Sequence, residues 1–349
     1  MRLLVLWTLL TIISAGIVWC LSAPAASGHH DTATPPLSGG FIQFTCDALK
    51  ELSGDDWHLV LRDMKALRMN TVILQYLAMA KNAGKDPPLF LFEELGTADP
   101  TPIILEQANK LNLNVYLGLL CPPGDSNAQP GFWKPDNLAT FAAANRSFAK
   151  QIGEKYRGFK GWYVPLENWL GKYPQPGSEE FPESWRKFYA DVTAACKSVR
   201  PLPVAISPCL PDPGYSNPNA EEAATVYEAM LRKTNLDIVM LQDSVGAKPK
   251  TWSPEGAAAY LPPLKKVCSA CGIQLWSNVE SFETVGSNRV PCSFSRFDQQ
   301  LSATSGVERR VTFDFFHYMN GKVRLKSWSP EYLRKIQELH DQYRDKFIK

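Results

Sequence analysis

Apolar runs and amphipathic stretches alternate along the chain from residue 40 onward. Eight runs of mainly apolar residues begin about 30 to 47 residues apart. Continuous apolar runs are typical of parallel β-strands that are covered on both faces. The pattern therefore predicts strands at residues 40–46, 70–77, 114–120, 161–167, 203–210, 238–246, 274–283 and 310–319.

The stretches between these runs carry helical signals. Trp57, Leu61 and Met64 recur at the spacing of one helix face. Ser53, a residue type preferred at helix starts, precedes them. A last helix is predicted to open at Ser329, because a proline follows it at the first helical position. The buried face of that helix is expected to consist of Leu333, Ile336, Leu339 and Tyr343.

This alternation of strand and helix, repeated eight times, predicts an α/β fold in the form of a single (β/α)8 TIM barrel over residues 40–349. A doubly wound open sheet is the alternative. Such sheets usually have fewer strands and a glycine-rich phosphate turn, and the chain contains no GxGxxG, GKS or GKT sequence. We therefore expect one barrel domain that carries the active site.

The first 28 residues have the composition of an export signal. Arg2 gives a positive amino end, residues 3–21 are almost continuously apolar, and Ala23-Pro24-Ala25 offers small residues for cleavage. An uncleaved membrane anchor is the alternative, because the apolar stretch is just long enough to span a bilayer. We expect a signal peptide and cleavage region at 1–28, a linker at 29–39, and a secreted or periplasmic product with no membrane attachment after cleavage.

Composition and charge narrow the class of protein. The chain has 349 residues, of which 45% are hydrophobic, and a formal net charge of +2 without a run of five basic residues. Because this leaves little charge to neutralise phosphates, we expect no nucleic-acid partner. Five histidines, two of them in the N-terminal tail, are few for a histidine-rich metal site. We expect no metal and no cofactor, and the oligomeric state and disulfide pairing stay open.

Polar residues close several of the predicted strands. In a barrel of this kind the reactive groups lie at the carboxyl ends of the strands and on the loops that follow. A polar residue that ends an apolar run is therefore a stronger candidate than one elsewhere. The residues in such positions are Gln75, Glu167, Gln242, Asp243, Asn278, Glu280, Glu283, Asp314 and His317.

Glu167 and Glu280 carry the clearest signal, since each ends an apolar, aromatic-rich run on predicted strands four and seven. Strand alternation places Tyr163 on the face of Glu167 and Asn278 on the face of Glu280. Two carboxylates that converge in the barrel mouth are what glycosidic-bond cleavage needs. Nearby aromatic rings should raise the pKa of Glu167, whereas Glu280 should stay ionised near the polar Asn278. Glu283 takes the place of Glu280 if the strand ends later.

Other side chains at the barrel mouth are expected to contact a sugar. Asp243 has two interpretations: it binds a sugar hydroxyl, or it sets the charge of a catalytic glutamate. Indole rings offer flat faces for sugar rings, and the loops after strands three, four and six contain Trp133, Trp169 and Trp252. The predicted substrate-binding residues are Gln75, Tyr163, Trp169, Asp243, Asn278 and His317.

The placement of the two glutamates resembles that in the clan A glycoside hydrolases. The resemblance implies that Glu167 is the general acid/base and Glu280 the nucleophile, with retention of configuration. One departure is Leu166, where that clan commonly has an asparagine. The span from Gly40 to about Tyr343 is similar to a family of exported glycosidase-like barrels known only as a domain of unknown function. The similarity lies in Gly-Gly-Phe-Ile-Gln (39–43), Asp-Trp-Xaa-Xaa-Xaa-Leu-Arg-Asp-Met-Lys-Ala-Leu (56–67), Asn-Thr-Val-Ile-Leu-Gln (70–75), Gly-Trp-Tyr-Val-Pro-Leu-Glu (161–167), Leu-Gln-Asp (241–243) and Trp-Ser-Asn-Val-Glu (276–280).

The sequence therefore predicts an exported glycoside hydrolase that cleaves O-glycosidic bonds, with an oligo- or polysaccharide as its partner. The alternative is a carbohydrate-binding barrel without catalysis, which would keep the aromatic surfaces and misorient the carboxylates. A metal-dependent hydrolase is disfavoured, because such barrels need several histidines at strand ends and the predicted strands offer His317 alone. The sugar, its linkage and its anomeric configuration stay open.

Overall fold

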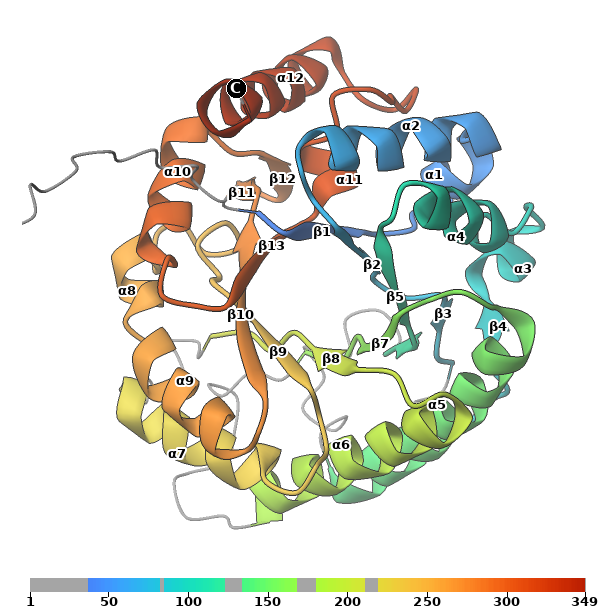
Figure 1. Cartoon of the computed structure of the whole chain (residues 1–349), viewed down its shortest axis with the longest axis vertical. Helices are drawn as coiled ribbons and strands as arrows, with labels where there is room; N and C mark the ends of the chain where they lie inside the picture. The colour runs from blue at the N-terminus through green and yellow to red at the C-terminus, as the bar shows by residue number, and fades with distance from the viewer. Residues whose placement is uncertain (1–36, 82–84, 123–133, 168–179, 211–218, 349) are drawn as a thin grey trace, which may run out of the picture. The chain divides into compact units, whose positions relative to one another are not determined.

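The centre of the molecule is a closed barrel of eight strands, and every neighbouring pair in it is parallel (Figure 1). The computed structural model describes residues 37–81, 85–122, 134–167, 180–210 and 219–348. The barrel strands are β1 (Gly39–Ile42), β2 (Thr71–Leu74), β5 (Asn114–Gly118), β7 (Gly161–Val164), β8 (Val204–Ile206), β9 (Ile238–Gln242), β10 (Gln274–Glu280) and β13 (Arg309–Phe313). Strand β1 pairs with both β2 and β13, which closes the ring.

A helix of ten or more residues follows each barrel strand, and these helices surround the strands in Figure 1. They are α2 (Gly54–Ala66), α4 (Thr101–Lys110), α5 (Pro135–Lys155), α6 (Glu180–Val199), α7 (Ala220–Leu231), α9 (Leu261–Ala270), α10 (Phe294–Ala303) and α12 (Pro330–Phe347). The predicted (β/α)8 barrel is confirmed. In the described ranges, no helix is long and apolar enough to cross a membrane.

Shorter helices and strands lie in the segments that connect the barrel strands to the long helices. The helices among them are α1 (Cys46–Glu51), α3 (Leu91–Leu95), α8 (Pro254–Ala258) and α11 (Phe315–Tyr318). The strands among them are β3 (Ala78–Met79), β4 (Leu89–Phe90), β6 (Leu120–Cys121), β11 (Phe282–Val285) and β12 (Asn288–Pro291). Strands β11 and β12 form an antiparallel hairpin directly after β10.

Local sequence signals explain where the helices begin and which face they bury. The Ser53 side chain accepts a hydrogen bond from the Asp56 backbone N–H, and the Asp56 carboxylate accepts one from the Ser53 N–H at 2.9 Å. This reciprocal capping satisfies N–H groups that the first turn of α2 leaves unpaired. The predicted apolar face of α2, including Trp57, is buried. Ser329 caps α12 as predicted, and Ile336 and Leu339 of its predicted face are buried.

Side chains fill the interior of the barrel. Phe41, Tyr163 and Trp276 belong to a buried cluster that is separate from the core between strands and helices. The rings of Phe41 and Tyr163 pack edge to face, with centroids 5.1 Å apart. Because the barrel centre is packed, any binding site must lie beyond the ends of the strands.

Several predicted strands end earlier than expected. The predicted strand 310–319 stops at Phe313, because Asp314 caps the short helix α11 and accepts a hydrogen bond from the His317 N–H at 2.7 Å. The predicted strand 274–283 stops at Glu280, and the hairpin β11–β12 follows. The predicted strand 40–46 stops at Ile42, since Cys46 already begins α1.

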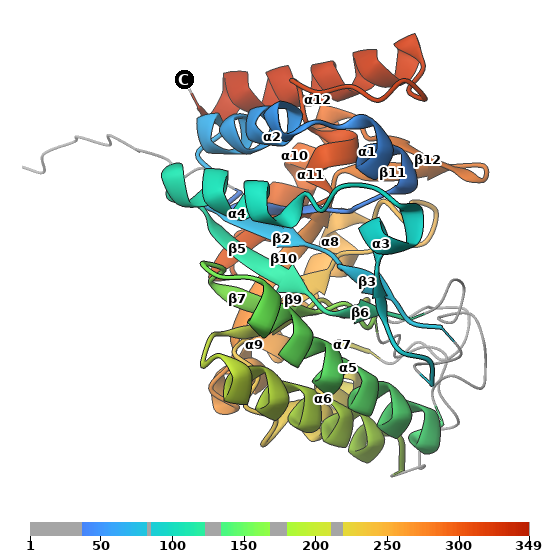
Figure 2. The ribbon, with the colours of Figure 1, turned by 90° about the vertical axis from the view of Figure 1, so that its right-hand side faces the viewer.

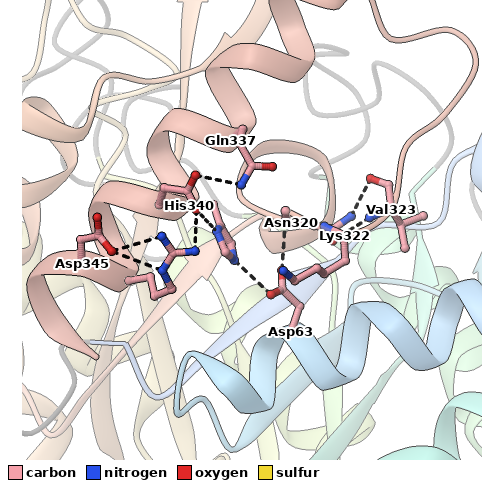
Figure 3. A network of polar contacts seen from close by, with 10 residues as sticks. Asp63, Asn320, Lys322, Val323, Gln337, His340 and Asp345 are labelled. Carbon is pink, nitrogen blue, oxygen red and sulfur yellow. Dashed lines mark hydrogen bonds and ion pairs between the residues drawn. The ribbon is translucent and has the colours of Figure 1, made fainter. Parts of the chain in front are cut away.

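A buried polar network joins the last helix to the first long one. His340 of α12 lies 3.0 Å from a carboxylate oxygen of Asp63 of α2, and both side chains are buried (Figure 3). The other Asp63 oxygen accepts a hydrogen bond from the Gly321 N–H. A Cβ atom on Gly321 would lie 2.9 Å from the His340 ring, so glycine permits this close packing.

Candidate active site

A cavity of about 120 Å³ lies at the carboxyl ends of the barrel strands. Gln75 follows β2, Glu167 follows β7, and Glu280 ends β10, so side chains from three well-separated barrel strands meet there. Hairpin β11–β12 projects at this end of the barrel (Figure 2). The described residues that line the cavity are Gln43, Gln75, Glu167, Cys209, Leu210, Gln242, Ser244, Ala247, Lys248, Trp252, Glu280, Phe282, Arg289 and Phe313.

The Glu167 carboxylate accepts hydrogen bonds from residues on or next to strands β8 and β9. Its Oε1 accepts a hydrogen bond from Nε2 of Gln242 at 3.0 Å, and its Oε2 accepts a weaker one from the Cys209 thiol at 3.8 Å. The Gln242 amide also donates to the Ser207 carbonyl at 2.7 Å, which fixes its orientation. Burial raises the pKa of Glu167, while Gln242, Arg289 and Cys209 act in the opposite direction. The raised pKa agrees with the expectation for this carboxyl.

Glu280 is almost completely buried, with 3% of its surface exposed. Its Oε2 accepts a hydrogen bond from the Ala247 backbone N–H at 2.7 Å. Gly246 makes this contact possible, because a Cβ atom there would lie 2.0 Å from the Phe282 carbonyl oxygen and 3.1 Å from Oε2 of Glu280. The loop after β9 therefore approaches Glu280 closely.

A second carboxylate, Asp243, lies against Glu280. Oδ1 of Asp243 accepts a hydrogen bond from the Glu280 backbone N–H at 3.4 Å, and Oδ2 accepts one from the Gln300 side-chain amide at 2.6 Å. Gln300, on α10, also donates to the Glu280 carbonyl at 3.3 Å. Asp243 and Gln300 are buried and are not among the residues that line the cavity. Of the two interpretations of Asp243, the contacts favour the one in which it sets the charge of Glu280.

The buried carboxylate pair changes the electrostatics of Glu280. Burial, followed by repulsion from Asp243, raises the pKa of Glu280 to about 8. Burial also raises the pKa of Asp243, to about 6, against the hydrogen bonds that Gln300 and Val245 donate. This raised pKa runs against the expectation that Glu280 stays ionised, and its causes are burial and the neighbouring Asp243 carboxylate.

Three other predicted substrate-binding residues, Tyr163, Asn278 and His317, are not among the residues that line the cavity. Tyr163 and Asn278 point into the packed barrel, where the Asn278 amide donates to the Ser207 hydroxyl at 3.0 Å. His317 lies 2.7 Å from a carboxylate oxygen of Asp314 and packs edge to face on Phe316. Among the predicted aromatic surfaces Trp252 lines the cavity, whereas Trp133 and Trp169 fall outside the described residues.

Strand-end reasoning missed several residues of the site. Gln43 follows β1 as Gln75 follows β2, so the same rule finds it once the end of β1 is known. Cys209 lies between β8 and α7, and its apolar neighbours in the sequence give no sign of a site residue. Arg289 comes from a hairpin that the hydrophobic pattern does not predict. Within the described part of the chain, no group of three or more His, Cys, Asp or Glu side chains is arranged to hold a metal ion.

Solved structures share this fold over nearly their whole length. A proposed α-L-fucosidase from Bacteroides thetaiotaomicron matches with a TM-score of 0.64 at 21% identity, over 97% of this chain and 99% of its own. A GH113 β-mannanase from Alicyclobacillus acidocaldarius matches with a TM-score of 0.54 at 13% identity, over 91% and 98% of the two chains. An endo-1,4-β-mannanase from Rhizomucor miehei matches with a TM-score of 0.53 at 12% identity, over 89% and 95%. At these identities the likeness shows the fold.

Comparison at the level of sequence gives the family. A search of curated proteins found no match. The model of a family described as "Domain of unknown function (DUF4434)" matches residues 37–323, a span that contains all eight barrel strands and both cavity glutamates. The expected resemblance to a family of glycosidase-like barrels without an assigned function is confirmed. The chain belongs to the DUF4434 family.

Proposed function

We propose that this protein is a glycoside hydrolase that cleaves O-glycosidic bonds in an oligo- or polysaccharide. The observation that carries the proposal is that Glu167 and Glu280, which lie 113 positions apart in the sequence, line one cavity at the carboxyl end of the barrel. Glu167 follows the fourth barrel strand, β7, and Glu280 ends the seventh, β10. Two carboxyl groups on either side of one bond are the minimum that this hydrolysis needs.

In the proposed reaction Glu167 is the general acid/base and Glu280 the nucleophile. Glu167 donates a proton to the leaving oxygen while Glu280 attacks the anomeric carbon and forms a glycosyl ester. Glu167 then takes a proton from water, whose oxygen attacks the anomeric carbon and releases Glu280, so that configuration is retained. Burial supports the acid role of Glu167, because it raises the pKa of that carboxyl.

Glu280 must lose its proton before it attacks. Its ionised form is favoured by the Ala247 N–H, Arg289 and Arg296. Burial and the charge of Asp243 have a larger effect on its pKa, and both act in the opposite direction. We therefore expect activity to rise with pH as Glu280 ionises. The fold supports the reaction class by analogy, since the matched structures include β-mannanases from two organisms.

The raised pKa of Glu280 favours a second candidate function, a carbohydrate-binding barrel without catalysis. A neutral Glu280 cannot attack a glycosidic carbon, but it can bind a sugar hydroxyl. Trp252, which lines the same cavity, suits the flat face of a sugar ring in either case. Release of a reducing sugar distinguishes the hydrolase from the binding protein.

We also propose that residues 1–28 direct export, with cleavage near Ala25, so that the barrel acts outside the cytoplasm. These residues lie outside the described part of the chain. The composition of the segment supports this proposal. Amino-terminal sequencing of the protein from the medium or periplasm of an expressing cell should begin near residue 26, and a full-length protein in the membrane fraction would contradict cleavage.

The proposed activity is tested by screening the protein against a panel of oligo- and polysaccharides for release of reducing ends. Glu167→Gln and Glu280→Gln should each lower turnover by about a thousandfold or more, because each removes a group that acts in the transition state. Glu283→Gln is the matched control, since Glu283 lies on the hairpin next to Glu280 but outside the cavity lining, and it should keep activity. Equal activity of all three variants would refute the assignment.

A further inference from the structure

Ser244 has a backbone conformation that is unusual for serine. Its φ angle is 55°, in the left-handed region that residues with a Cβ atom rarely adopt. The other described non-glycine residues with a positive φ are Arg68, Asn112, Lys233 and Asn235. Arg68, Asn112 and Lys233 each follow the C-cap of a helix, where a left-handed residue is common. Asn235 belongs to a residue type that tolerates this region. Ser244 follows strand β9, so the end of a helix does not explain its conformation.

Hydrogen bonds on both sides hold Ser244 in this conformation. Before it, the Asp243 N–H donates to the Asn278 carbonyl at 3.1 Å, and Oδ1 of Asp243 accepts a hydrogen bond from the Val245 N–H at 3.2 Å. After it, the Lys248 N–H donates to the Ser244 carbonyl at 3.0 Å. The fold therefore keeps a serine in a conformation that costs free energy, which is most often found at binding and catalytic sites.

The loop that contains Ser244 also contacts Glu280. Asp243, the preceding residue, accepts a hydrogen bond from the Glu280 backbone N–H, and the Ala247 N–H donates to Oε2 of Glu280 at 2.7 Å. Ser244 itself lines the cavity that contains Glu167 and Glu280. Ser244 therefore belongs to the part of the cavity wall that is built around the proposed nucleophile.

The Ser244 hydroxyl is available to a ligand. The residue is 6% exposed. Within the described part of the chain its hydroxyl forms no hydrogen bond, and it is not one of the polar atoms that the protein encloses completely, so it faces the cavity. The Gln242 amide, which also lines the cavity, differs because its N–H groups already donate to Glu167 and Ser207. A serine hydroxyl both donates and accepts hydrogen bonds, as a sugar hydroxyl does.

We propose that Ser244 is a substrate-binding residue whose hydroxyl forms a hydrogen bond with a ring hydroxyl of the sugar unit bound against Glu280. The inference rests on the proposed function and adds a specificity-determining residue to the same site. Glycine would fit this backbone conformation better, but it would remove the hydroxyl together with the strain. A sugar that lacks the contacted hydroxyl is disfavoured, because it leaves the Ser244 hydroxyl without a partner.

The contact is tested with Ser244→Ala, which removes the hydroxyl and keeps the Cβ atom. For the glycan selected from the panel of oligo- and polysaccharides, kcat/KM should fall about tenfold, the loss expected for one hydrogen bond. Monodeoxy analogues of that glycan, each lacking one ring hydroxyl, locate the partner. One analogue should be cleaved about tenfold more slowly than the parent glycan by the wild type, and at nearly the same rate as the parent by Ser244→Ala.

Ser244→Gly separates this role from a role in folding. It should lower kcat/KM as Ser244→Ala does, while its midpoint of urea unfolding should equal or exceed that of the wild type, because glycine adopts a positive φ without strain. Lys233→Gly is the matched control, since Lys233 also has a positive φ but is exposed and lies outside the cavity lining, and it should keep full activity. A midpoint of Ser244→Gly well below that of Ser244→Ala would show that Ser244 serves the fold, and would overturn the inference.

The inference and the proposed function fail in different ways. Unchanged kcat/KM in Ser244→Ala, or an equal loss for the parent glycan and every deoxy analogue, overturns the inference and leaves the hydrolase proposal intact. If the wild type binds a glycan of the panel but cleaves none, dissociation constants replace kcat/KM in the same comparison. The pairing of Ser244 with one sugar hydroxyl then supports the inference, and the hydrolase proposal alone is lost. No binding to any glycan overturns both.

Discussion

At the scale of single residues, the surroundings of Glu280 decide when it is ionised. Asp243 is held in place by side-chain and backbone donors, at 2.6 Å from Gln300 and 3.2 Å from the Val245 N–H. One carboxylate oxygen of Glu280 accepts a hydrogen bond from the Ala247 N–H. Of the two buried carboxyls, Asp243 has the larger set of donors and the lower pKa, so it ionises first. Its negative charge then opposes the ionisation of Glu280.

Replacing Asp243 by asparagine should therefore make Glu280 easier to ionise. Asp243→Asn removes the repulsion that raises the pKa of Glu280, so the acidic limb of the kcat/KM profile should move to lower pH by about one pH unit. The profile measured on a cleaved glycan reports this limb for the free enzyme. Asp298→Asn, on the outside of α10 where Asp298 pairs with Lys346 at 2.6 Å, is the control and should leave the limb in place. An unchanged limb in Asp243→Asn would mean that Asp243 does not act through Glu280.

At the scale of elements, α12 completes the ring of helices through a polar contact that hydrophobic periodicity does not predict. The apolar face of α12 is predictable, because Ile336, Leu339 and Tyr343 follow helical spacing. His340 interrupts this face, and its partner Asp63 is 277 positions away in the sequence. A polar residue on a predicted core face has no local signal for its partner, so only the folded arrangement of α2 and α12 reveals the pair (Figure 3).

The free energy of unfolding should depend on pH through His340. Burial lowers the pKa of His340, but hydrogen bonds and charges of Asp63 and Asp341 outweigh burial and raise it above its ordinary value. The charged histidine therefore stabilises the fold fully below the unfolded pKa of about 6.5, and this contribution is lost as the pH rises through the folded pKa.

His340→Gln removes this contribution, and we expect a loss of about 3 kcal/mol near pH 6, because it leaves a buried carboxylate without its cation. Urea unfolding at pH 6 and pH 9 should show a smaller difference from wild type at the higher pH. His58→Gln, on α2 outside the network, is the control. A difference that is the same at both pH values would show that His340 is neutral in the fold.

At the scale of the whole molecule, the barrel was predictable and the details of its rim were not. Apolar runs and helix faces recur along the chain, so local periodicity locates all eight strands and the order of the elements. The strand ends were predicted less well, because capping by Asp314 and the hairpin after Glu280 override the apolar pattern. The rule that reactive groups lie at strand ends selected Gln75, Glu167 and Glu280, and these three residues line one cavity in the structure.

The rest of the site depends on contacts that no local pattern encodes. Asn278 occupies a strand face as predicted, but it donates to Ser207 inside the barrel and does not reach the cavity. The raised pKa of Glu280 was not expected, since the sequence does not show that Asp243 lies against it. Gln300 of α10 gives no sequence signal at all, because an amide on a helix is ordinarily a surface residue.

The central claim is that Glu167 and Glu280 act on the same glycosidic bond in different roles, and azide rescue tests it most directly. Glu167→Ala and Glu280→Ala are given the aryl glycoside of the sugar that the panel identifies, with sodium azide, and the products are analysed by NMR. We predict that azide restores turnover in both variants, giving a glycosyl azide of the substrate's configuration with Glu167→Ala and of the opposite configuration with Glu280→Ala. Undiminished hydrolysis by either alanine variant without azide would contradict the claim, and exchanged configurations would reverse the two roles.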